Sequence, residues 1–598
     1  MTGSATRALE IEQLIVRYYG RSEDALHDVS LALEPGAFVS VAGANGAGKS
    51  TLALAAAGLI PRIVRAETAG RVVIDGEVAL DRGGGEGVGS RPASAGRRQG
   101  YRAGIVFPNP ANQLSGTKTT VREEIAFGLE NLGVLRAEMD ARIDRVLADL
   151  HIEHLADRPP YAISGGEQQR VAIASIIAMD LPLLVLDEPT AQLDPLATGS
   201  VADHLVQLAG EGVAVLAAEH AAAVLARSKA TLVLSGGRTM AFAPPGTALQ
   251  PAALAGTGLE SPTLVALAAA AGLGPELAFD EAAIAAALRR NPPATTDTGP
   301  RPGDEAPGNV WQPVRAQAPA AIQVRGLIHR YPTGVEALRG IDLDIPPGQS
   351  VAIVGQNGSG KTTLVKHLNG LLAPTSGDVR VGGASVAGVP VHRMASTVGF
   401  VFQNPDDQLF SRSVEAELHF GPRNLRLPKA DADRLVEAAL EAIGLTADRA
   451  ANPYDLNVSA RKLIAIGSVL ATDPAVLVLD EPTTGQDSPG IERVGAIVDM
   501  LHAAGRTVIA ISHDMEFAAR HFERVIVMRL GQIVADGPPA ATLGGSRAEL
   551  LATTGLTPPP AARVAALLGL EVVPADAGQL LAALATLPAR SGAPAARS

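Results

Sequence analysis

A long internal duplication constrains this chain more than any other feature of its sequence. Residues 43–51, GANGAGKST, return as GQNGSGKTT at residues 355–363, which is 312 positions later. Residues 183–190, LLVLDEPT, return as VLVLDEPT at residues 476–483, which is 293 positions later. Self-similarity over such a distance marks a repeated structural unit. With 598 residues, the chain is long enough for two copies of one domain, each with its own core.

The segments outside the duplicated motifs suggest how the copies are joined. Residues 81–100 are rich in Gly, Ser and Arg, which predicts an inserted surface loop in the first copy. Residues 291–320 are dense in Pro, Ala, Gly and Thr without helical periodicity, which predicts a linker. A second repeat, residues 258–288 and 555–584, predicts a small helical appendage after each copy. The rest of each copy alternates β-branched runs with helical patterns, as in a mainly parallel α/β sheet.

Composition and hydropathy exclude several classes of protein. The formal net charge of −12 argues against a general nucleic-acid binder, so no nucleic acid is expected as a partner. The absence of cysteine excludes a disulfide scaffold and a thiolate metal site. Residues 1–13 lack a signal-peptide pattern, and no stretch approaches about 18 consecutive apolar residues. We therefore expect no spanning helix, and any membrane contact would go through a partner.

Both copies carry a glycine-rich phosphate-binding loop. Residues 43–50 and 355–362 follow the P-loop pattern, each between an apolar strand and a helix-like run. Glycines let backbone N–H groups wrap phosphates, and the following helix start adds positive potential. Each lysine is predicted to reach the β and γ phosphates, and each hydroxyl after it to ligate Mg²⁺. The predicted nucleotide-binding residues are Gly43, Asn45, Gly46, Gly48, Lys49, Ser50 and Thr51, together with Gly355, Asn357, Gly358, Gly360, Lys361, Thr362 and Thr363.

Acidic residues end a buried strand in each copy. Asp187 and Asp480 close apolar runs and are predicted to hold a hydrated magnesium ion. Glu188 and Glu481 follow them directly and are predicted to orient and polarise the attacking water. Such an ending is otherwise a solvated turn, an alternative that the phosphate loops disfavour.

A histidine ends a further apolar strand in each copy. His220 and His513 are 293 positions apart, the same offset as the acidic residues. A lone histidine at a strand end is more often structural. The equal offset favours contact with the γ phosphate, and we count both histidines among the predicted catalytic residues.

Together these motifs resemble the ABC ATPase family. The most specific match is ISGGEQQRVAIA at residues 163–174, which looks like the family signature. The resemblance implies ATP hydrolysis with ATP and Mg²⁺, and two domains that pair head to tail within the chain. Each nucleotide would then lie between one domain's P-loop and the other domain's signature. The resemblance adds as ATP-binding residues Ser164, Gly165, Gly166, Glu167 and Gln403, the last also as a magnesium ligand.

The resemblance also implies the fold and its divisions. We expect an α/β protein with two P-loop ABC ATPase domains, helical signature subdomains and small C-terminal helical appendages. The expected order is an ATPase domain at 8–248, an appendage at 249–290, a linker at 291–320, a second ATPase domain at 321–548, and an appendage with a tail at 549–598.

Tyrosines precede each P-loop where members of the family stack the adenine. Tyr331 occupies this place in the second copy, and Tyr18 or Tyr19 occupies it in the first. The adjacent pair leaves the register of the first copy open. The alternative role, a strand aromatic packed in the core, has comparable weight there.

A finer resemblance lies between the P-loop and the signature. Residues 401–425, matched by residues 106–132, look like the ATPase subunits of energy-coupling factor transporters, which drive uptake of vitamins and transition-metal ions. This implies as partners a transmembrane coupling subunit and a substrate-binding membrane subunit, with the chain peripheral at the cytoplasmic face of the cell membrane. Four glutamates lie where relatives meet the coupling helices, the alternative being a solvated helix face: Glu123, Glu124, Glu415 and Glu417.

Two other functions compete with an importer motor. A soluble tandem ATPase that acts on ribosomes usually has a long, charged helical linker, whereas this linker is rich in Pro and Ala. Fused sugar-importer ATPases typically have an eroded second phosphate loop, whereas both loops are intact here. Both comparisons favour the energy-coupling factor type.

The two copies depart from the family pattern in different ways. Residues 457–460 read NVSA where residues 164–167 read SGGE, which compromises close approach of the backbone to phosphate. Pro108 stands where the second copy has Gln403, and proline offers neither a side-chain amide nor a backbone N–H. Head-to-tail pairing would bring both departures to the Lys49 site. We therefore expect that site to be degenerate, and principal turnover to occur at the Lys361 site.

Overall fold

The computed structural model of the chain describes residues 7–82, 102–291 and 322–586. The first two ranges form the first half and the third forms the second half, and each half holds a six-stranded and a four-stranded sheet. Residues 83–100 of the predicted insertion and 292–320 of the predicted linker lie outside the described residues. The domain bounds given above stay predictions.

The six-stranded sheets carry the strands that precede the candidate site. In the first half the order is β10-β9-β3-β8-β7-β6, and in the second it is β16-β17-β18-β13-β19-β20. Only the pairs β10–β9 and β19–β20 are antiparallel. A parallel sheet buried on both faces reads as continuous apolar runs, which explains the sequences of these strands. Their bounds are β3 (Phe38–Ala42), β6 (Ala103–Val106), β7 (Leu183–Asp187), β8 (Ala214–Ala218), β9 (Ala230–Ser235), β10 (Arg238–Ala243), β13 (Ser350–Val354), β16 (Val398–Val401), β17 (Val476–Asp480), β18 (Thr507–Ile511), β19 (Arg524–Arg529) and β20 (Gln532–Gly537).

The four-stranded sheets are antiparallel and lie beside the P-loops. Their orders are β2-β1-β4-β5 and β12-β11-β14-β15. Alternating burial along β2 and β12 shows one face packed on the core and the other exposed. Their bounds are β1 (Leu9–Tyr18), β2 (Leu26–Leu33), β4 (Ala66–Ile74), β5 (Glu77–Arg82), β11 (Ile322–Arg330), β12 (Glu336–Ile345), β14 (Ser376–Val381) and β15 (Ala384–Ser385).

The helix after each P-loop begins at the P-loop lysine. The residue before it is Gly48, with a φ of 102°, or Gly360, with a φ of 101°. A Cβ at Gly48 would lie 2.7 Å from the carbonyl oxygen of Ala25, so only glycine fits this turn. The helices are α1 (Lys49–Ala56) and α11 (Lys361–Leu368).

A helical subdomain in each half carries the signature. The first contains α2 (Val121–Leu132), α3 (Arg136–Asp149) and α4 (Gly165–Ile177), and the second contains α13 (Val414–Asn424), α14 (Lys429–Ile443) and α15 (Val458–Leu470). Ser164 and Glu167 form a capping box at the start of α4, and Asn457 caps α15. The other core helices are α5 (Pro195–Gly210), α6 (Ala222–Leu225), α12 (Val391–Met394), α16 (Ser488–Ala503) and α17 (Met515–His521).

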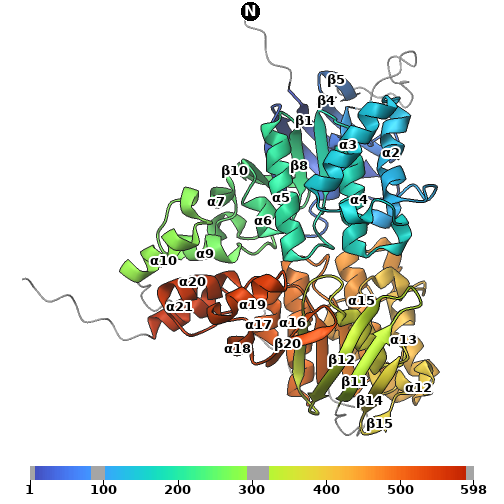
Figure 1. The fold of residues 1–598 in the computed structure, drawn as a ribbon. Coiled ribbons are helices and arrows are strands. Elements are labelled where there is room, and N and C mark those ends of the chain that lie inside the picture. The colour runs from blue at the N-terminus through green and yellow to red at the C-terminus, as the bar shows by residue number, and fades with distance from the viewer. Residues whose placement is uncertain (1–6, 83–101, 292–321, 587–598) are drawn as a thin grey trace, which may run out of the picture.

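The two appendages lie side by side and share one hydrophobic core (Figure 1). Ile284 and Leu288 of the first contribute to it with Val564 and Leu580 of the second. Their helices are α8 (Pro251–Leu254), α9 (Thr263–Ala270), α10 (Glu281–Arg290), α19 (Ala548–Thr553), α20 (Pro560–Leu568) and α21 (Ala577–Ala585). The short helices α7 (Pro245–Ala248) and α18 (Pro539–Thr542) precede them.

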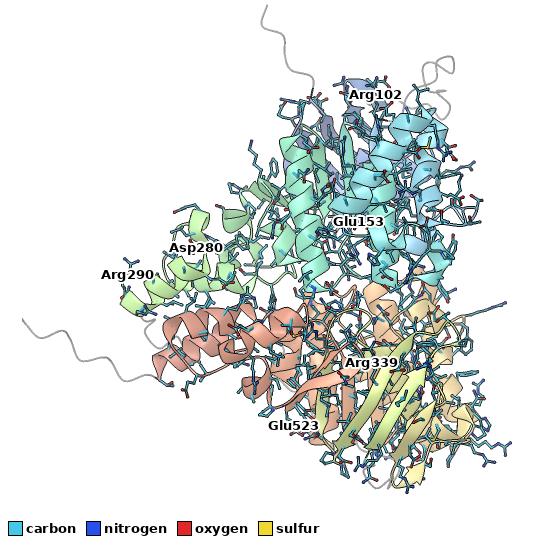
Figure 2. All side chains as sticks on the ribbon, in the orientation of Figure 1. Arg102, Glu153, Asp280, Arg290, Arg339 and Glu523 are labelled. Carbon is cyan, nitrogen blue, oxygen red and sulfur yellow. The ribbon has the colours of Figure 1, made fainter. Side chains whose placement is uncertain are left out.

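Charged side chains mark the two ends of α10. Asp280 caps its start, where it accepts from the backbone N–H of Ala283 at 2.9 Å, and Arg290 lies in its last turn (Figure 2). Both placements complement the helix dipole. No helix among the described residues is long and apolar enough to cross a membrane.

Candidate functional site

Each P-loop lysine lies inside its own loop. Nζ of Lys49 donates to the carbonyl oxygen of Gly43 at 2.8 Å, and Nζ of Lys361 donates to that of Gly355 at 2.7 Å. Burial lowers the pKa of both ammonium groups, while the nearby acidic side chains act in the opposite direction. The two loops therefore present a buried cation beside their backbone N–H groups.

A divalent cation fits the ends of β7 and β17. Burial raises the pKa of Asp187 and of Asp480 to about 6 in each case. Oδ1 of Asp187 is buried without a hydrogen-bond partner among the described residues. Oδ1 of Asp480 accepts from Oγ1 of Thr362 at 3.4 Å. Buried carboxylates are costly unless they are paired or bind a metal, and oxygen ligands of this kind suit magnesium.

The glutamate after each aspartate has a left-handed backbone, with a φ of 47° at Glu188 and 49° at Glu481. Oε2 of Glu481 accepts from Nε2 of Gln403 at 3.0 Å. Burial opposes ionisation of Glu481, but the positive charges of His513, Lys361 and Lys462 lower its pKa to about 2. Glu481 is therefore an ionised carboxylate at neutral pH.

Each histidine lies against the glutamate of its own half. Nε2 of His220 is 3.5 Å from Oε1 of Glu188, and Nδ1 of His513 is 3.5 Å from Oε2 of Glu481. Burial opposes protonation of His513, but Glu481 outweighs this and raises its pKa. The predicted contact with the γ phosphate stays a prediction.

The halves meet head to tail at their P-loops. The backbone N–H of Asn45 donates to Oδ2 of Asp487 at 2.9 Å, and Nδ2 of Asn45 donates to the carbonyl oxygen of Gly485 at 3.3 Å. In the reciprocal contact, Nδ2 of Asn357 donates to the carbonyl oxygen of Gln192 at 3.2 Å. Each P-loop thus touches the segment after the other half's glutamate.

The sequence did not lead us to predict these contacts between the halves, although it repeats an aspartate that makes them. Asp194 and Asp487 follow the LDEPT motif at the same 293-residue offset. Asp194 reaches the backbone N–H of Asn357 at 3.5 Å, as Asp487 reaches that of Asn45. Glu219 was also missed: it is buried before His220, with burial raising its pKa.

The intact signature faces the second P-loop. A Cβ at Gly166 would lie 2.7 Å from Nδ2 of Asn357, so the glycine permits close approach of the two halves. Oε2 of Glu167 accepts from the backbone N–H of Ser164 at 2.8 Å, which fixes the first turn of α4. Ser164 and its neighbours therefore lie at the Lys361 site, as head-to-tail pairing predicts.

The altered signature is bound to its own half. Oγ of Ser459, which replaces Gly166, donates to Oε1 of Gln486 and reaches Oδ1 of Asp487 at 3.3 Å. Gln486 itself replaces Leu193. The serine hydroxyl is thereby turned toward the segment that contacts Asn45.

A hydrogen bond identifies which tyrosine of the first half is equivalent to Tyr331. Oη of Tyr18 is 3.0 Å from Oγ1 of Thr51, and Oη of Tyr331 is 3.0 Å from Oγ1 of Thr363. Tyr19 is 67% exposed. Tyr18 is thus the equivalent of Tyr331. Tyr18 and Tyr19 both line an open cavity of about 420 Å³. Adenine stacking at these positions stays a prediction.

A family model for ABC transporters matches residues 26–191 and 338–484, once in each half. The chain belongs to the ABC transporter family. This membership confirms the predicted fold class of two P-loop ABC ATPase domains and the predicted ATP hydrolysis with ATP and Mg²⁺. ATPases of ABC transporters partner with transmembrane subunits.

Two similar proteins match nearly the whole ABC ATPase, and one solved structure matches about a third of it. A relative from Methanosarcina acetivorans, described as an ABC transporter ATP-binding protein, is 36% identical and covers 93% of this chain and 90% of its own. A relative of the same description from Caldanaerobacter subterraneus subsp. tengcongensis is 33% identical and covers 88% of this chain and 90% of its own. A solved structure of cbiO1 from Clostridium perfringens, part of the ABC transporter complex cbiONQ, is 34% identical with a TM-score of 0.35, and covers 37% of this chain and 90% of that one.

Two of the four glutamates in the first turns of α2 and α13 are buried. Oε1 of Glu124 accepts from the backbone N–H of Ser115 at 2.6 Å, and Oε2 of Glu417 accepts from that of Ser411 at 2.7 Å. The alternative of a solvated helix face is therefore wrong for Glu124 and Glu417. Glu123 completes the capping box of α2, and Glu415 accepts from Arg449 at 2.8 Å.

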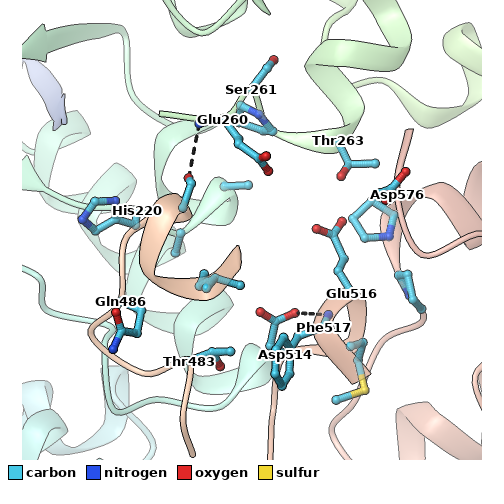
Figure 3. A pocket seen from close by; sticks show the side chains of 18 of the residues that line it. His220, Glu260, Ser261, Thr263, Thr483, Gln486, Asp514, Glu516, Phe517 and Asp576 are labelled. Carbon is cyan, nitrogen blue, oxygen red and sulfur yellow. Dashed lines mark hydrogen bonds between the residues drawn. The ribbon is translucent and has the colours of Figure 1, made fainter. Parts of the chain in front are cut away.

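A cavity of about 2460 Å³ lies between the halves of the ABC ATPase, beyond the P-loop contacts. His220 and Gln486 line one end, and Thr263, Glu516 and Asp576 line the other (Figure 3). Glu516 comes from α17 of the second half and Thr263 from α9 of the first. The cavity thus connects the glutamate of the first half to the appendages.

Proposed function

We propose that this ABC ATPase energises a membrane importer of the energy-coupling factor type, for a vitamin or a metal ion, with one consensus and one degenerate ATP site. The observation that carries the inequality of the sites is the hydrogen bond from Gln403 to Glu481, because Pro108 offers no such donor to Glu188. The importer type rests on the resemblance of residues 401–425 to that group.

The proposed consensus site combines residues of both halves. Lys361 neutralises phosphate charge, Glu481 orients and polarises the attacking water, and Gln403 holds the carboxylate of Glu481. Thr362, Asp480 and Gln403 would hold magnesium, which when bound neutralises charge on the β and γ phosphates. The SGGE residues 164–167 complete the site from the other half.

The proposed degenerate site retains Lys49, Ser50, Asp187 and Glu188. It lacks an amide at Pro108 and faces Ser459, whose hydroxyl is bound to Gln486. Loss of preorganised donors to the transition state costs on the order of 10²-fold or more in rate. This site is therefore slow in hydrolysis.

The proposed contact with the transmembrane subunit lies on α13 and on the loop before it. Phe410 and Phe420 are 58% and 45% exposed, and their rings meet edge to face with centroids 4.6 Å apart. Exposed large apolar side chains that gather in one place mark interaction sites. Glu417 anchors the loop that carries Phe410, because it accepts from the backbone N–H groups of Phe410 and Ser411. A helix of a membrane partner packed here would keep the chain at the cytoplasmic face of the membrane.

Co-expression with the membrane proteins of its neighbouring genes tests the proposal. We expect the chain to co-purify from detergent-solubilised membranes, and Phe410→Asp with Phe420→Asp to abolish this while the thermal midpoint stays unchanged. As a matched control, Leu135→Asp alters another exposed apolar residue, 76% exposed, outside the proposed contact. Co-sedimentation with ribosomes instead would favour a soluble ATPase that acts on ribosomes.

A further inference from the structure

A lysine that sequence reasoning did not single out lies at the centre of the Lys361 site. Lys462, on α15, is 1% exposed and is among the largest fully buried side chains of the described residues. Its Nζ donates to the carbonyl oxygen of Gln403 at 2.6 Å and to that of Glu481 at 2.7 Å. One ammonium group therefore joins two segments that are 78 residues apart in sequence.

The first half has no equivalent cation at this position. Gln169 precedes Lys462 by the 293-residue offset and is also buried. Its Nε2 donates to the carbonyl oxygen of Phe107 at 3.4 Å, while its Oε1 is buried without a hydrogen-bond partner among the described residues. The pair of short hydrogen bonds that Nζ of Lys462 donates is thus a feature of the second half.

The geometry explains why the side chains of Gln403 and Glu481 meet. Burying an ammonium group is costly unless hydrogen bonds satisfy it, and charge-assisted hydrogen bonds are the strong ones. Lys462 satisfies two of its three donors on the main chains that carry the two side chains. With both main chains fixed, Nε2 of Gln403 stands 3.0 Å from Oε2 of Glu481.

We propose that Lys462 is a positioning residue for ATP hydrolysis, holding the main chain of Gln403 against that of Glu481 so that their side chains stay in contact. The importance of this for total turnover rests on the proposed function, which assigns the principal site to Lys361. Helix α15 then serves two sites: its altered start faces the Lys49 site, and Lys462 supports the Lys361 site of its own half.

Lys462→Met, which keeps most of the length of the side chain and removes the ammonium group, tests the proposal in the full-length protein. In nucleotide-free protein, we expect hydrogen exchange of residues 402–410 to accelerate by about threefold or more, because their anchor is lost. Exchange of residues 107–113 in the first half stays unchanged. In a Glu188→Gln background, where turnover reports the Lys361 site, kcat falls by about tenfold or more while KM changes less than about threefold.

Two further variants keep the outcome decisive. Lys462→Gln, which installs the residue of the first half, replaces Lys462→Met if that variant does not fold. Gln169→Met is the matched control, and we expect its changes in hydrogen exchange to be confined to the first half. Unchanged exchange at residues 402–410 in a folded variant, or faster exchange with unchanged kcat, overturns the role of Lys462. Loss of all turnover in Glu188→Gln alone instead overturns the proposed inequality of the sites. In that case the hydrogen-exchange measurement alone tests the role of Lys462.

Discussion

Nε2 of Gln403 donates to Oε2 of Glu481 at 3.0 Å, and Pro108 takes the place of that glutamine in the first half. This difference adds to the altered signature, residues 457–460, that faces the Lys49 site. Glu481 has a hydrogen-bond donor that holds its carboxylate, whereas Glu188 has its contacts with Lys49 at 3.8 Å and His220 at 3.5 Å.

Glu481 and Glu188 are expected to contribute unequally to ATP turnover. Glu481→Gln removes the carboxylate of the proposed consensus site, so nearly all steady-state ATP hydrolysis is lost. Glu188→Gln alters the slow site and leaves a substantial fraction of the steady-state ATP hydrolysis. Phosphate release at saturating ATP measures both variants against the unchanged chain, and equal losses would contradict two unequal sites.

Ser459 and Gln486 are expected to behave as one stabilising unit. Ser459→Gly leaves Oε1 of Gln486 buried without its donor, which costs about 1–3 kcal/mol in the free energy of unfolding. Gln486→Leu added to Ser459→Gly installs the first-half pair and recovers most of that loss. A double-mutant cycle by urea unfolding measures the coupling, and additive effects of the two changes would refute it.

Restoring the first site should return turnover to it. In a Glu481→Gln background, Pro108→Gln supplies the missing amide, and a signature rebuilt as SGGE at residues 457–460, with Gln486→Leu, restores the glycine approach. We expect hydrolysis to rise by about tenfold or more over the background, because preorganised donors return. Single-turnover kinetics with excess protein measure the rise, and the same changes without a gain would place the defect elsewhere.

Much of the site follows from sequence, because its motifs are local. The P-loops, the acidic strand ends and the histidines are each carried by a strand and the turn that follows it, so the repeat places them without knowledge of the packing. Lys462 and Gln486 act through partners that lie 59 and 27 residues away, and only the packing of α15 shows which carbonyl or amide each one meets. The choice of Tyr18 over Tyr19 likewise needed the packing, which shows the hydrogen bond between Tyr18 and Thr51, 33 residues away.

The shared core of the appendages is expected to stabilise the paired halves more than their ion pair does. Leu580→Ala removes a fully buried side chain from this core and should cost about 2–5 kcal/mol. Arg563 pairs with Glu281 across the same interface, but both side chains are partly exposed, so Arg563→Ala should cost less than about 1 kcal/mol. Urea unfolding compares the two variants, and a larger loss in Arg563→Ala would reverse this ranking.

Glu516 is expected to make stability depend on pH at the cavity between the halves. Burial, and then Asp514, raise the pKa of Glu516 from its ordinary 4.5 to about 7. Because the folded state binds the proton more tightly, this stability is fully present below the unfolded pKa and is lost as pH rises through about 7. Glu516→Gln mimics the neutral acid and should raise the thermal midpoint over the unchanged chain, by an amount that grows from about pH 5 to about pH 8. Asp514→Asn tests the second cause, since it leaves Glu516 in place and removes the neighbouring carboxylate that raises its pKa. A difference between Glu516→Gln and the unchanged chain that stays constant over this range would show that Glu516 has an ordinary pKa in the folded protein.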